Sequence, residues 1–291
     1  MRLGIQNLNS KLFSNQDELK QKYNKLKVTS ILSTTKKSIF WLKNLTNYSL
    51  FKEGVLIISE EILDELKLVG ELNKNIFHLI CEKNITPRLA YCLLLNECLI
   101  KQKSYDETKK HKKNKKIKIF GTPIIFDNVV IGEGSVIYPN VVIHSNVKIG
   151  KNCIIRENTS LGGSGMGFEK GLNGEWISFP QLGGLVIGDN VEIGSHCDVK
   201  RGAIEDTIIS NNCKIGSFTN IGHNSIIGEN SLFTNHCVVA GSVKIGQNFF
   251  MGINSSIKNG IIIGNNVTVA ANVFINKNIN DNELSFGINQ K

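Results

Sequence analysis

Large apolar residues recur at every sixth position through the second half of the chain. From residue 209 to residue 275 the pattern continues without a slip, at Ile209, Ile215, Ile221, Ile227, Phe233, Val239, Ile245, Met251, Ile257, Ile263, Val269 and Ile275. The next position is often Gly or Ala, and the fifth is mostly small or β-branched. A period of six places no apolar stripe on a helix with about 3.6 residues per turn, so an amphipathic helix is excluded.

This repeat predicts a parallel β-helix. Each block of six forms a short strand and a turn, and three blocks close one triangular coil. The leading side chain points into the prism, while the frequent Asn and Gly residues suit the tight turns between faces. The same phase begins at Ile119 or Ile125 and is clear from Ile131 to Leu161.

Two interruptions separate the early repeats from the late ones. The long one, residues 162–186, reads GGSGMGFEKGLNGEWISFPQLGGLV, and the short one contains the residues from Arg201 to Thr207. Regular coils form a rigid scaffold, and loops that leave such a scaffold tend to carry function. Both interruptions are therefore candidate parts of a functional site.

Short apolar runs alternate with helical patterns before residue 100. Strands are predicted at Lys37–Leu42, Val55–Ile58 and Asn75–Cys81, and helices at Gln16–Leu26, Glu60–Leu68 and Pro87–Ile100. The prediction is a small α+β domain over residues 1–100, a Lys-rich linker over 101–118, a β-helix over 119–278 and a short tail over 279–291.

Composition narrows the class of protein. The net charge is +9, but nine lysines and two acids between Lys101 and Lys118 account for +7 of it. One Lys-rich segment without a reading element favours a solvated linker over a nucleic-acid binder. No apolar run approaches the length of about 18 residues needed to span a membrane. The polar first residues lack the apolar core of a signal peptide, so we expect a cytoplasmic protein.

The number and spacing of the seven cysteines do not indicate a disulfide framework. Four of them occupy the fifth position of a six-residue block, where a small inward side chain is needed: Cys153, Cys197, Cys213 and Cys237. The other three, Cys81, Cys92 and Cys98, lie in apolar segments with a helical pattern. We expect all seven to pack in cores.

The amino-acid sequence at the two interruptions resembles that of a known family. The segments GFEKGLNGEWISFPQLGGLVIGDNVEIG, VKRGAIEDTII and NIGHNSIIGEN are similar to the UDP-3-O-acylglucosamine N-acyltransferases of lipid A synthesis. That family belongs to the left-handed β-helix, or hexapeptide-repeat, acyltransferases. The resemblance extends from about Ile143 to the end of the chain, and more weakly over residues 29–100. It implies a left-handed β-helix, a homotrimer with active sites between prisms, and an N-terminal nucleotide-recognition domain.

The resemblance also implies the catalytic residues. His223 matches the family's catalytic histidine, and an imidazole can accept the amine proton near neutral pH. Gly241 matches a glycine whose backbone N–H stabilises the oxyanion. Asn224, Glu205 and Asp206 are expected to contact substrate, and a loop carboxylate near the imidazole would raise its basicity.

Two further groups of residues follow from the same resemblance. The aromatics that stack on the nucleotide base fall in the segment that supplies Phe40, Trp41, Asn44 and Tyr48. The acyl donor is expected at the later coils, near Lys258, Gly260 and Lys277.

Three departures from the family bear on the donor. The family's usual Asp-Asn pair before the histidine is Gly216-Ser217 here, and a second family histidine falls on Gly260. The family's C-terminal helices, which contact acyl carrier protein, have no counterpart after Lys277. We therefore expect acyl-CoA as co-substrate, no bound cofactor, and a UDP- or dTDP-linked amino sugar of surface glycan synthesis as acceptor.

Three alternatives were weighed against this expectation. The first is the lipid A enzyme itself, with acyl carrier protein as donor, and the second is a non-catalytic trimeric scaffold. Zinc catalysis, known in some hexapeptide proteins, requires clustered histidines. The spacing of His196, His223 and His236 does not stack all three on one edge, so no metal site is predicted.

Overall fold

The computed structural model describes residues 2–4, 6, 8, 10–23, 25–28, 38–43, 45–98 and 116–286. The chain divides into two compact units. The first, unit 1, contains Met1–Ser104 and Met166–Pro180, and unit 2 contains Tyr105–Gly165 and Gln181–Lys291. The greater part of the predicted Lys-rich linker, residues 101–115, lies outside the described residues.

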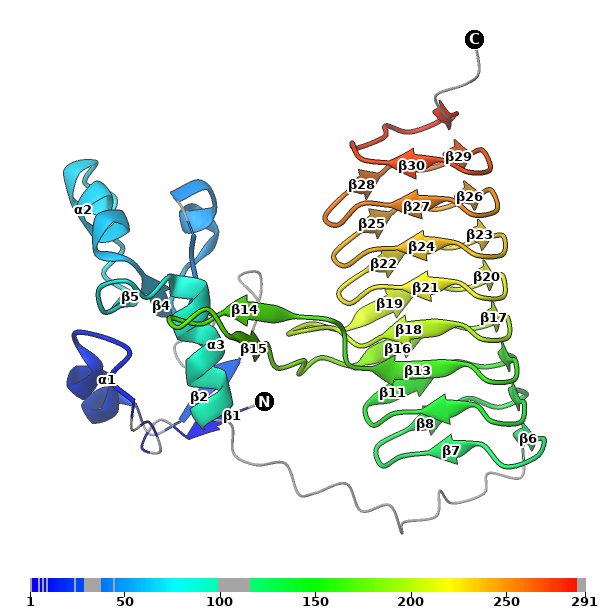
Figure 1. Cartoon of the computed structure of the whole chain (residues 1–291), viewed down its shortest axis with the longest axis horizontal. Helices are drawn as coiled ribbons and strands as arrows, with labels where there is room; N and C mark the ends of the chain where they lie inside the picture. Colours follow the sequence, from blue (N-terminus) through cyan, green and yellow to red (C-terminus); the bar gives the residue numbers. More distant parts are fainter. Residues whose placement is uncertain are drawn as a thin grey trace. The chain divides into compact units, whose positions relative to one another are not determined.

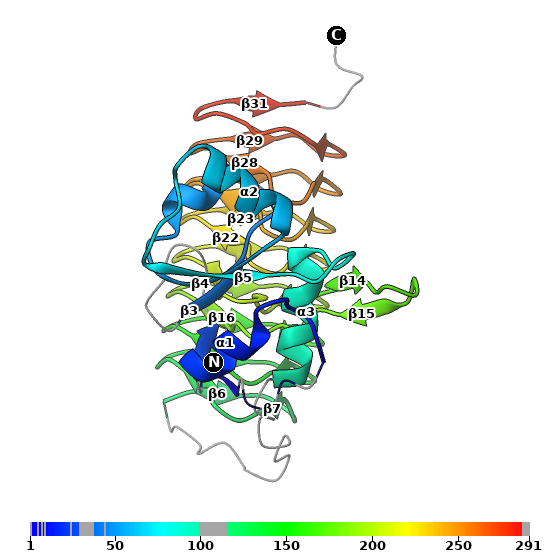
Figure 2. The same ribbon diagram turned by 90° about the vertical axis from the view of Figure 1, so that its left-hand side faces the viewer.

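Unit 1 is built on a five-stranded sheet with strands in chain order. The strands are β1 (Arg2–Gly4), β2 (Lys25–Val28), β3 (Ser38–Trp41), β4 (Gly54–Ile58) and β5 (Ile76–Ile80). Strand β1 runs antiparallel to β2, and the other neighbours are parallel. The helices are α1 (Gln16–Lys22), the 3-10 helix η3 (Leu45–Leu50), α2 (Glu60–Leu68) and α3 (Pro87–Cys98). Figure 2 shows α2 and α3 beside the sheet.

Local signals explain why α2 begins and ends where predicted. Ser59 precedes it in an extended conformation, and its hydroxyl accepts a hydrogen bond from the backbone N–H of Ile62 at 3.5 Å. Glu60 and Glu61 occupy the first turn, and Lys67 lies in the last, as the helix dipole favours. Strands β1 and β2 were not predicted; β2 occupies residues that the expected Gln16–Leu26 helix partly covered.

A β-hairpin from the long interruption belongs to unit 1. It consists of β14 (Phe168–Lys170) and β15 (Trp176–Ser178), paired antiparallel. It is anchored on α3: Arg88 forms an ion pair with Glu169, and the side-chain amide of Asn96 donates to the carbonyl of Ser178 at 3.0 Å. Figure 1 labels the hairpin alongside α3. The interruption was predicted as a loop of the β-helix domain, whereas residues 166–180 group with the N-terminal unit.

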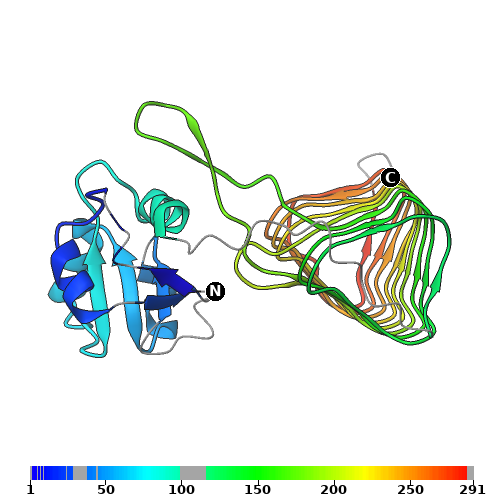
Figure 3. The same cartoon turned by 90° about the horizontal axis from the view of Figure 1, so that it is seen from below.

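Unit 2 is a left-handed parallel β-helix with three flat faces, visible as a triangular section in Figure 3. Face 1 contains β7 (Ile124–Ile125), β10 (Val142–Ile143), β13 (Ser160–Gly163), β18 (Asp198–Lys200), β21 (Asn220–Ile221), β24 (Val238–Val239), β27 (Ser256–Ile257) and β30 (Phe274–Ile275). Face 2 contains β8 (Val130–Ile131), β11 (Val147–Ile149), β16 (Leu185–Ile187), β19 (Thr207–Ile209), β22 (Ile226–Ile227), β25 (Lys244–Ile245) and β28 (Ile262–Ile263). Face 3 contains β6 (Lys118–Ile119), β9 (Val136–Ile137), β12 (Ile154–Ile155), β17 (Glu192–Ile193), β20 (Lys214–Ile215), β23 (Leu232–Phe233), β26 (Phe250–Met251), β29 (Thr268–Val269) and β31 (Leu284–Ser285).

The predicted leading residues form the core of the prism. Every one from Ile209 to Ile275 is at most 4% exposed. Cysteines at the fifth position are buried beside them, as predicted, and burial raises the pKa of the Cys197 and Cys213 thiols to about 11. Inert, protonated thiols are consistent with packing.

The turns between faces explain the abundance of asparagine. In most turns the fourth residue of the block adopts a left-handed backbone with φ near +60°, as at Asn212, Asn230 and Asn248. Among residues with a side chain, Asn tolerates this conformation best. Its amide also bonds to the asparagine eighteen residues later, for example from Asn248 to Asn266 at 2.9 Å. These ladders fix the eighteen-residue coil.

One corner replaces the asparagine ladder with aromatic rings. His196, Phe218 and His236 share the left-handed conformation, and their rings stack with centroids 4.9 Å apart. Both histidines are turn residues, as predicted. Within the described part of the chain, no helix is long and apolar enough to cross a bilayer.

Candidate functional site

The turn that follows β21 presents His223 at the corner between faces 1 and 2, which we call the His223 corner. The side chain is half-buried. Gly241 follows β24, one coil further along the same corner. A Cβ built on Gly241 would lie 2.6 Å from His223 Nε2, with the imidazole supplying all three nearest atoms. The two residues predicted to be catalytic are therefore in direct contact.

Gly241→Ala should lower kcat by about 10-fold, because the added methyl forces the imidazole away from its rotamer at a cost of up to about 1.5 kcal/mol. Steady-state kinetics would measure the change. The matched control is the same substitution in a His223→Ala background, where the methyl has no ring to displace. An equal loss in both backgrounds would contradict the steric explanation.

The second wall of the corner comes from the ends of the long interruption. A Cβ on Gly165 would lie 2.9 Å from His223 Cδ2 and 3.3 Å from the side-chain oxygen of Gln181. The repeat pattern did not single out either residue. A glycine just before the inserted hairpin was the only available signal, and many glycines surround it in the sequence.

Asn224 forms hydrogen bonds with residues that build the His223 corner. Its Oδ1 lies 2.9 Å from His223 Nδ1 and accepts a hydrogen bond from the backbone N–H of Ala203, also at 2.9 Å. Its own backbone N–H donates to Thr207 Oγ1 at 2.9 Å. These bonds orient the side chain within the protein, and its predicted contact with substrate stays a prediction.

The short interruption supplies Glu205 and Asp206, the two loop carboxylates expected to contact substrate. Asp206 Oδ1 accepts a hydrogen bond from the backbone N–H of Gly184 at 2.6 Å, which ties together the two interruptions of the repeat. Glu205 contributes its backbone carbonyl, 3.4 Å from the side-chain nitrogen of Asn224. The side-chain oxygen of Asn224 bonds to His223 Nδ1. The substrate contacts expected of Glu205 and Asp206 stay predictions.

The predicted donor-binding residues occupy the same corner in the next coils. Lys258 and Gly260 follow β27, and Lys277 follows β30, and all three are exposed. Gly260 has φ of 74°, and its backbone N–H donates to the carbonyl of Gly241 at 3.0 Å. Asn259 holds the same carbonyl through its side-chain nitrogen at 2.6 Å. Their role towards an acyl donor stays a prediction.

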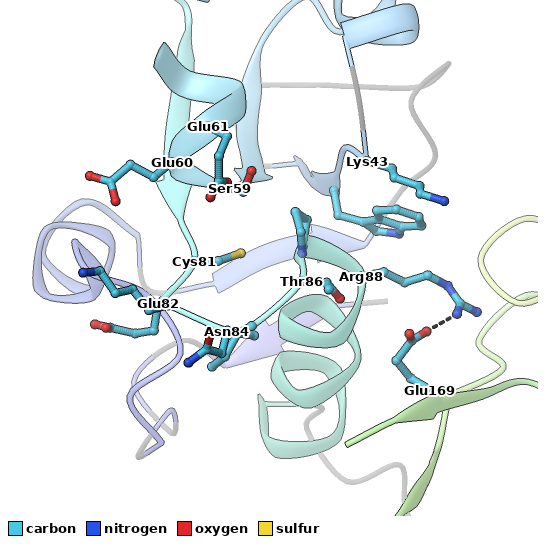
Figure 4. Close-up of a pocket in the computed structure, with 14 residues that line it drawn as sticks. Lys43, Ser59, Glu60, Glu61, Cys81, Glu82, Asn84, Thr86, Arg88 and Glu169 are labelled. Atoms are coloured by element: carbon cyan, nitrogen blue, oxygen red, sulfur yellow. Dashed lines mark hydrogen bonds and ion pairs between the residues drawn. The ribbon is translucent and has the colours of Figure 1, made fainter. Parts of the chain in front are cut away.

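A separate cavity of about 710 Å³ lies in unit 1. Trp41 ends β3, Ser59 follows β4, and Cys81 follows β5, so the cavity opens at the carboxyl ends of parallel strands, where α/β sheets commonly bind ligands. Figure 4 shows Lys43 and Arg88 at one end of it. Trp41 is therefore well placed for the predicted role in nucleotide binding.

The cavity contains charges of both signs. Lys43, Lys83 and Arg88 line it together with Glu60, Glu61, Glu82 and Glu169. The Ser59 hydroxyl lowers the pKa of Glu61 by hydrogen bonding, which keeps that carboxylate charged. Helix α3 points its first turn at the same cavity, and Thr86 Oγ1 accepts from the backbone N–H of Leu89 at 3.2 Å. A ligand here meets both donors and carboxylates.

Of the other aromatics predicted to bind nucleotide, two do not line this cavity. Phe40 packs between Trp41 and Tyr91, at ring distances of 6.1 and 6.3 Å. Tyr48 is only 5% exposed and uses its hydroxyl internally: it accepts from the backbone N–H of Asn73 and bonds to His78 Nε2, both at 3.0 Å. The prediction for Tyr48 is wrong, because the residue belongs to the core. Asn44 lies outside the described residues.

The half-buried His78, which bonds to the buried Tyr48, should make unit 1 acid-sensitive. Burial lowers the pKa of His78, so the unfolded chain takes up a proton more readily than the folded one once pH falls below about 6.5. Stability should be full above that pH and fall below it. Melting curves at about pH 7.5 and 5.5 should show a larger drop for wild type than for His78→Gln. Equal drops would contradict the linkage.

Comparison with known proteins addresses the repeat directly. Residues 128–163 and 206–241 match the family described as "Bacterial transferase hexapeptide (six repeats)", and residues 242–277 match "Hexapeptide repeat of succinyl-transferase". These segments coincide with the coils of unit 2. These three segments of the chain thus carry the hexapeptide repeat of bacterial transferases.

The similarity of the hexapeptide-repeat chain to its curated relatives is strong but local. UDP-3-O-acylglucosamine N-acyltransferase from Coxiella burnetii is 40% identical over 79 residues, which are 27% of this chain and 23% of the relative. The same-named protein from Hydrogenovibrio crunogenus is 36% identical over 108 residues, 37% of this chain and 31% of its own. The chain thus matches only a quarter to a third of these relatives' length.

Solved structures support the fold of the hexapeptide-repeat unit. The UDP-N-acetylglucosamine acyltransferase of Francisella novicida superposes with a TM-score of 0.53 at 26% identity, covering 60% of this chain and 64% of that one. LpxA from Acinetobacter baumannii gives a TM-score of 0.51 at 28% identity, over 60% and 65% of the two chains.

The departures noted in the sequence can now be located on the hexapeptide-repeat prism. Gly216 and Ser217 follow β20 at the corner between faces 3 and 1, whereas His223 lies between faces 1 and 2. Ser217 is engaged at its own corner, where its backbone N–H donates to Asn235 Oδ1 at 2.9 Å.

Proposed function

We propose that this chain transfers an acyl group from a thioester to the amine of a UDP-linked sugar. The observation that carries the proposal is the His223 corner, where the Nε2 edge of an imidazole faces the backbone of Gly241 too closely for any side chain to intervene. Relatives named UDP-3-O-acylglucosamine N-acyltransferase support the reaction class.

The corner supplies the groups that acyl transfer requires. The amine nitrogen attacks the thioester carbon and loses a proton to His223, while the C–S bond breaks and the thiolate leaves. The imidazolium then returns its proton to that thiolate. The peptide groups beside Gly241 are held rigidly, because its carbonyl accepts hydrogen bonds from Gly260 and Asn259. A fixed backbone N–H stabilises an oxyanion without reorganising.

The comparisons favour a different donor from our first expectation. Acyl-CoA followed from the departures at Gly216, Ser217 and Gly260, whereas the curated relatives bear the name of the lipid A enzyme, for which the family resemblance implies acyl carrier protein. We therefore propose acyl carrier protein as the preferred donor and UDP-3-O-acylglucosamine as the acceptor. Acyl-CoA with a nucleotide-linked amino-dideoxy sugar becomes the competing arm of the test.

We further propose that the unit 1 cavity holds the nucleotide. Its size, its position at the carboxyl ends of β3, β4 and β5, and the indole of Trp41 support binding of a planar base. A homotrimer is part of the same proposal, and outward apolar side chains such as Phe250, Ile262 and Phe274, each at least 40% exposed, are consistent with subunit contacts.

The deciding experiment measures thiol release by the purified protein. Each donor, 3-hydroxyacyl carrier protein or 3-hydroxyacyl-CoA, is offered with UDP-3-O-acylglucosamine or with a dTDP-linked amino sugar. Turnover with the carrier protein and the UDP sugar supports the proposal, and turnover only with CoA overturns the donor. Absence of turnover in every combination supports a scaffold role. Light scattering at the mass of one chain would remove the trimer.

A further inference from the structure

The side-chain amide of Asn224 has its direction set by two backbone groups of opposite kind. One end lies 2.9 Å from the N–H of Ala203, which can only donate, so the atom there is the oxygen. The other end lies 3.4 Å from the carbonyl oxygen of Glu205, which can only accept, so the atom there is the nitrogen. A flipped amide would lose both contacts.

This direction determines which ring nitrogen of His223 carries the proton. The same Oδ1 of Asn224 lies 2.9 Å from His223 Nδ1. An amide oxygen has no hydrogen to give, so Nδ1 must donate and must carry the proton. In the neutral ring, Nε2 then has the free lone pair, and Nε2 is the atom that faces Gly241.

We propose that Asn224 is a positioning residue that holds His223 as the Nδ1–H tautomer, so that its Nε2 lone pair faces the reacting amine. This inference rests on the proposed function for its catalytic meaning. An amide at this place orients the ring without placing a negative charge on Nδ1. A carboxylate would do both.

The short interruption of the repeat builds the support for Asn224. Gly202 starts a tight reversal in which any Cβ would collide with the carbonyl oxygen of Glu205. Before it, the nearly buried Arg201 donates to the carbonyl of Ser145, which anchors the loop to the prism. The reversal turns the N–H of Ala203 towards Asn224. The extra residues of this turn thus have a function that the repeat alone would not provide.

Charged groups also surround the corner, and the test must separate them from Asn224. Glu205 and Asp206 lie on the loop packed against Asn224, and Lys258 lies on the same corner further along the prism. Beside the ring lies Gly165, and the side chain next to Gly165 is the neutral amide of Gln181. A charge at longer range changes proton affinity but does not choose between Nδ1 and Nε2, so the tautomer itself is the specific readout.

The tautomer can be measured without any assay of activity. Protein labelled with ¹⁵N-histidine is studied by long-range ¹H–¹⁵N correlation near pH 8, and the His223 signals are assigned by their loss in His223→Gln. We expect a pyrrole-type Nδ1 and a pyridine-type Nε2 in wild type. The opposite pattern, or a mixture of the two forms as in free histidine, overturns the proposal even if the protein is an active acyltransferase.

Kinetics then test the catalytic meaning. Asn224→Gly retains the left-handed backbone, φ 58° in the structure, while removing the amide. We expect kcat to fall about 5- to 10-fold, the effect of one ordinary hydrogen bond, with KM within about 2-fold. Asn224→Asp should recover most of kcat and move the acidic limb of the pH–rate profile upward by about one pH unit, because a carboxylate stabilises the imidazolium.

The matched control is Asn230→Gly, at the next corner of the same coil. Asn230 has φ of 59°, and its side-chain oxygen accepts from Asn212, away from His223. It should leave kcat and the His223 signals unchanged. Wild-type kcat in Asn224→Gly, or an unmoved pH limb in Asn224→Asp, overturns the positioning role. If no donor and acceptor give turnover, the proposed function fails while the tautomer measurement still stands.

Discussion

Replacing His223 with Ala is expected to lower kcat by about 100-fold or less, with KM near its wild-type value. General bases contribute about 10²–10⁴-fold, and three features put His223 at the low end. Its Nδ1 partner is the neutral amide of Asn224, an amine near pH 8 is already partly deprotonated, and the departing thiolate can collect the proton. Single-turnover and steady-state kinetics would separate chemistry from binding.

A second corner histidine provides the control for this experiment. His236→Asn replaces an exposed histidine with the residue that other coils carry in the same left-handed conformation. It should leave kcat within about 2-fold of wild type, since it lies outside the His223 corner. A loss above about 10⁴-fold in His223→Ala, with binding intact, would mean that a catalytic partner beyond those described here acts through the ring.

Phe233→Ala is expected to destabilise unit 2 by about 3–5 kcal/mol. Phe233 is the largest of the leading residues from Ile209 onward, is 1% exposed, and packs against Phe249 with ring centroids 5.4 Å apart. Its removal leaves a cavity that coils held by backbone ladders on both sides cannot readily close. Denaturant unfolding followed by hydrogen exchange at prism amides would report the loss for this unit.

Phe250→Ala is the matched comparison for that variant. Phe250 lies on the neighbouring strand of face 3 but points outward and is 40% exposed. In a single chain its loss should cost less than about 1 kcal/mol. An equally large loss for Phe250→Ala would contradict the assignment of inner and outer positions, or reveal that this side of the prism is covered in the assembled protein.

The fold of unit 2 was predictable because each six-residue block forms the same short strand and turn. An inward aliphatic residue at Ile221 or Ile257 and a left-handed turn at Asn254 are decided by immediate neighbours in sequence. The same regularity placed His223 and Gly241 on one corner. Contact between them followed once the coil length was known.

Residues whose roles depend on distant partners were predicted poorly. The sequence predicted Tyr48 as an aromatic that stacks on the base. In the structure its hydroxyl bonds to His78, thirty residues later, and the ring lies in the core. The bond from the N–H of Ala203 to Asn224 could not be predicted either, because nothing in the sequence says where that N–H points. The inserted hairpin reads as a loop of the prism because its anchor, Arg88, lies 81 residues earlier.

The uniform direction of pairing in unit 2 has a consequence for how the protein is made. Each coil bonds to the one completed just before it, and β24, for example, pairs with β21 and then with β27. The coils can therefore form in order as the chain leaves the ribosome, because each new strand pairs with a strand of the coil already formed. After β13, growth of the stack waits until the ribosome has released residues 164–184, because the next strand to pair is β16, which bonds to β11 on face 2.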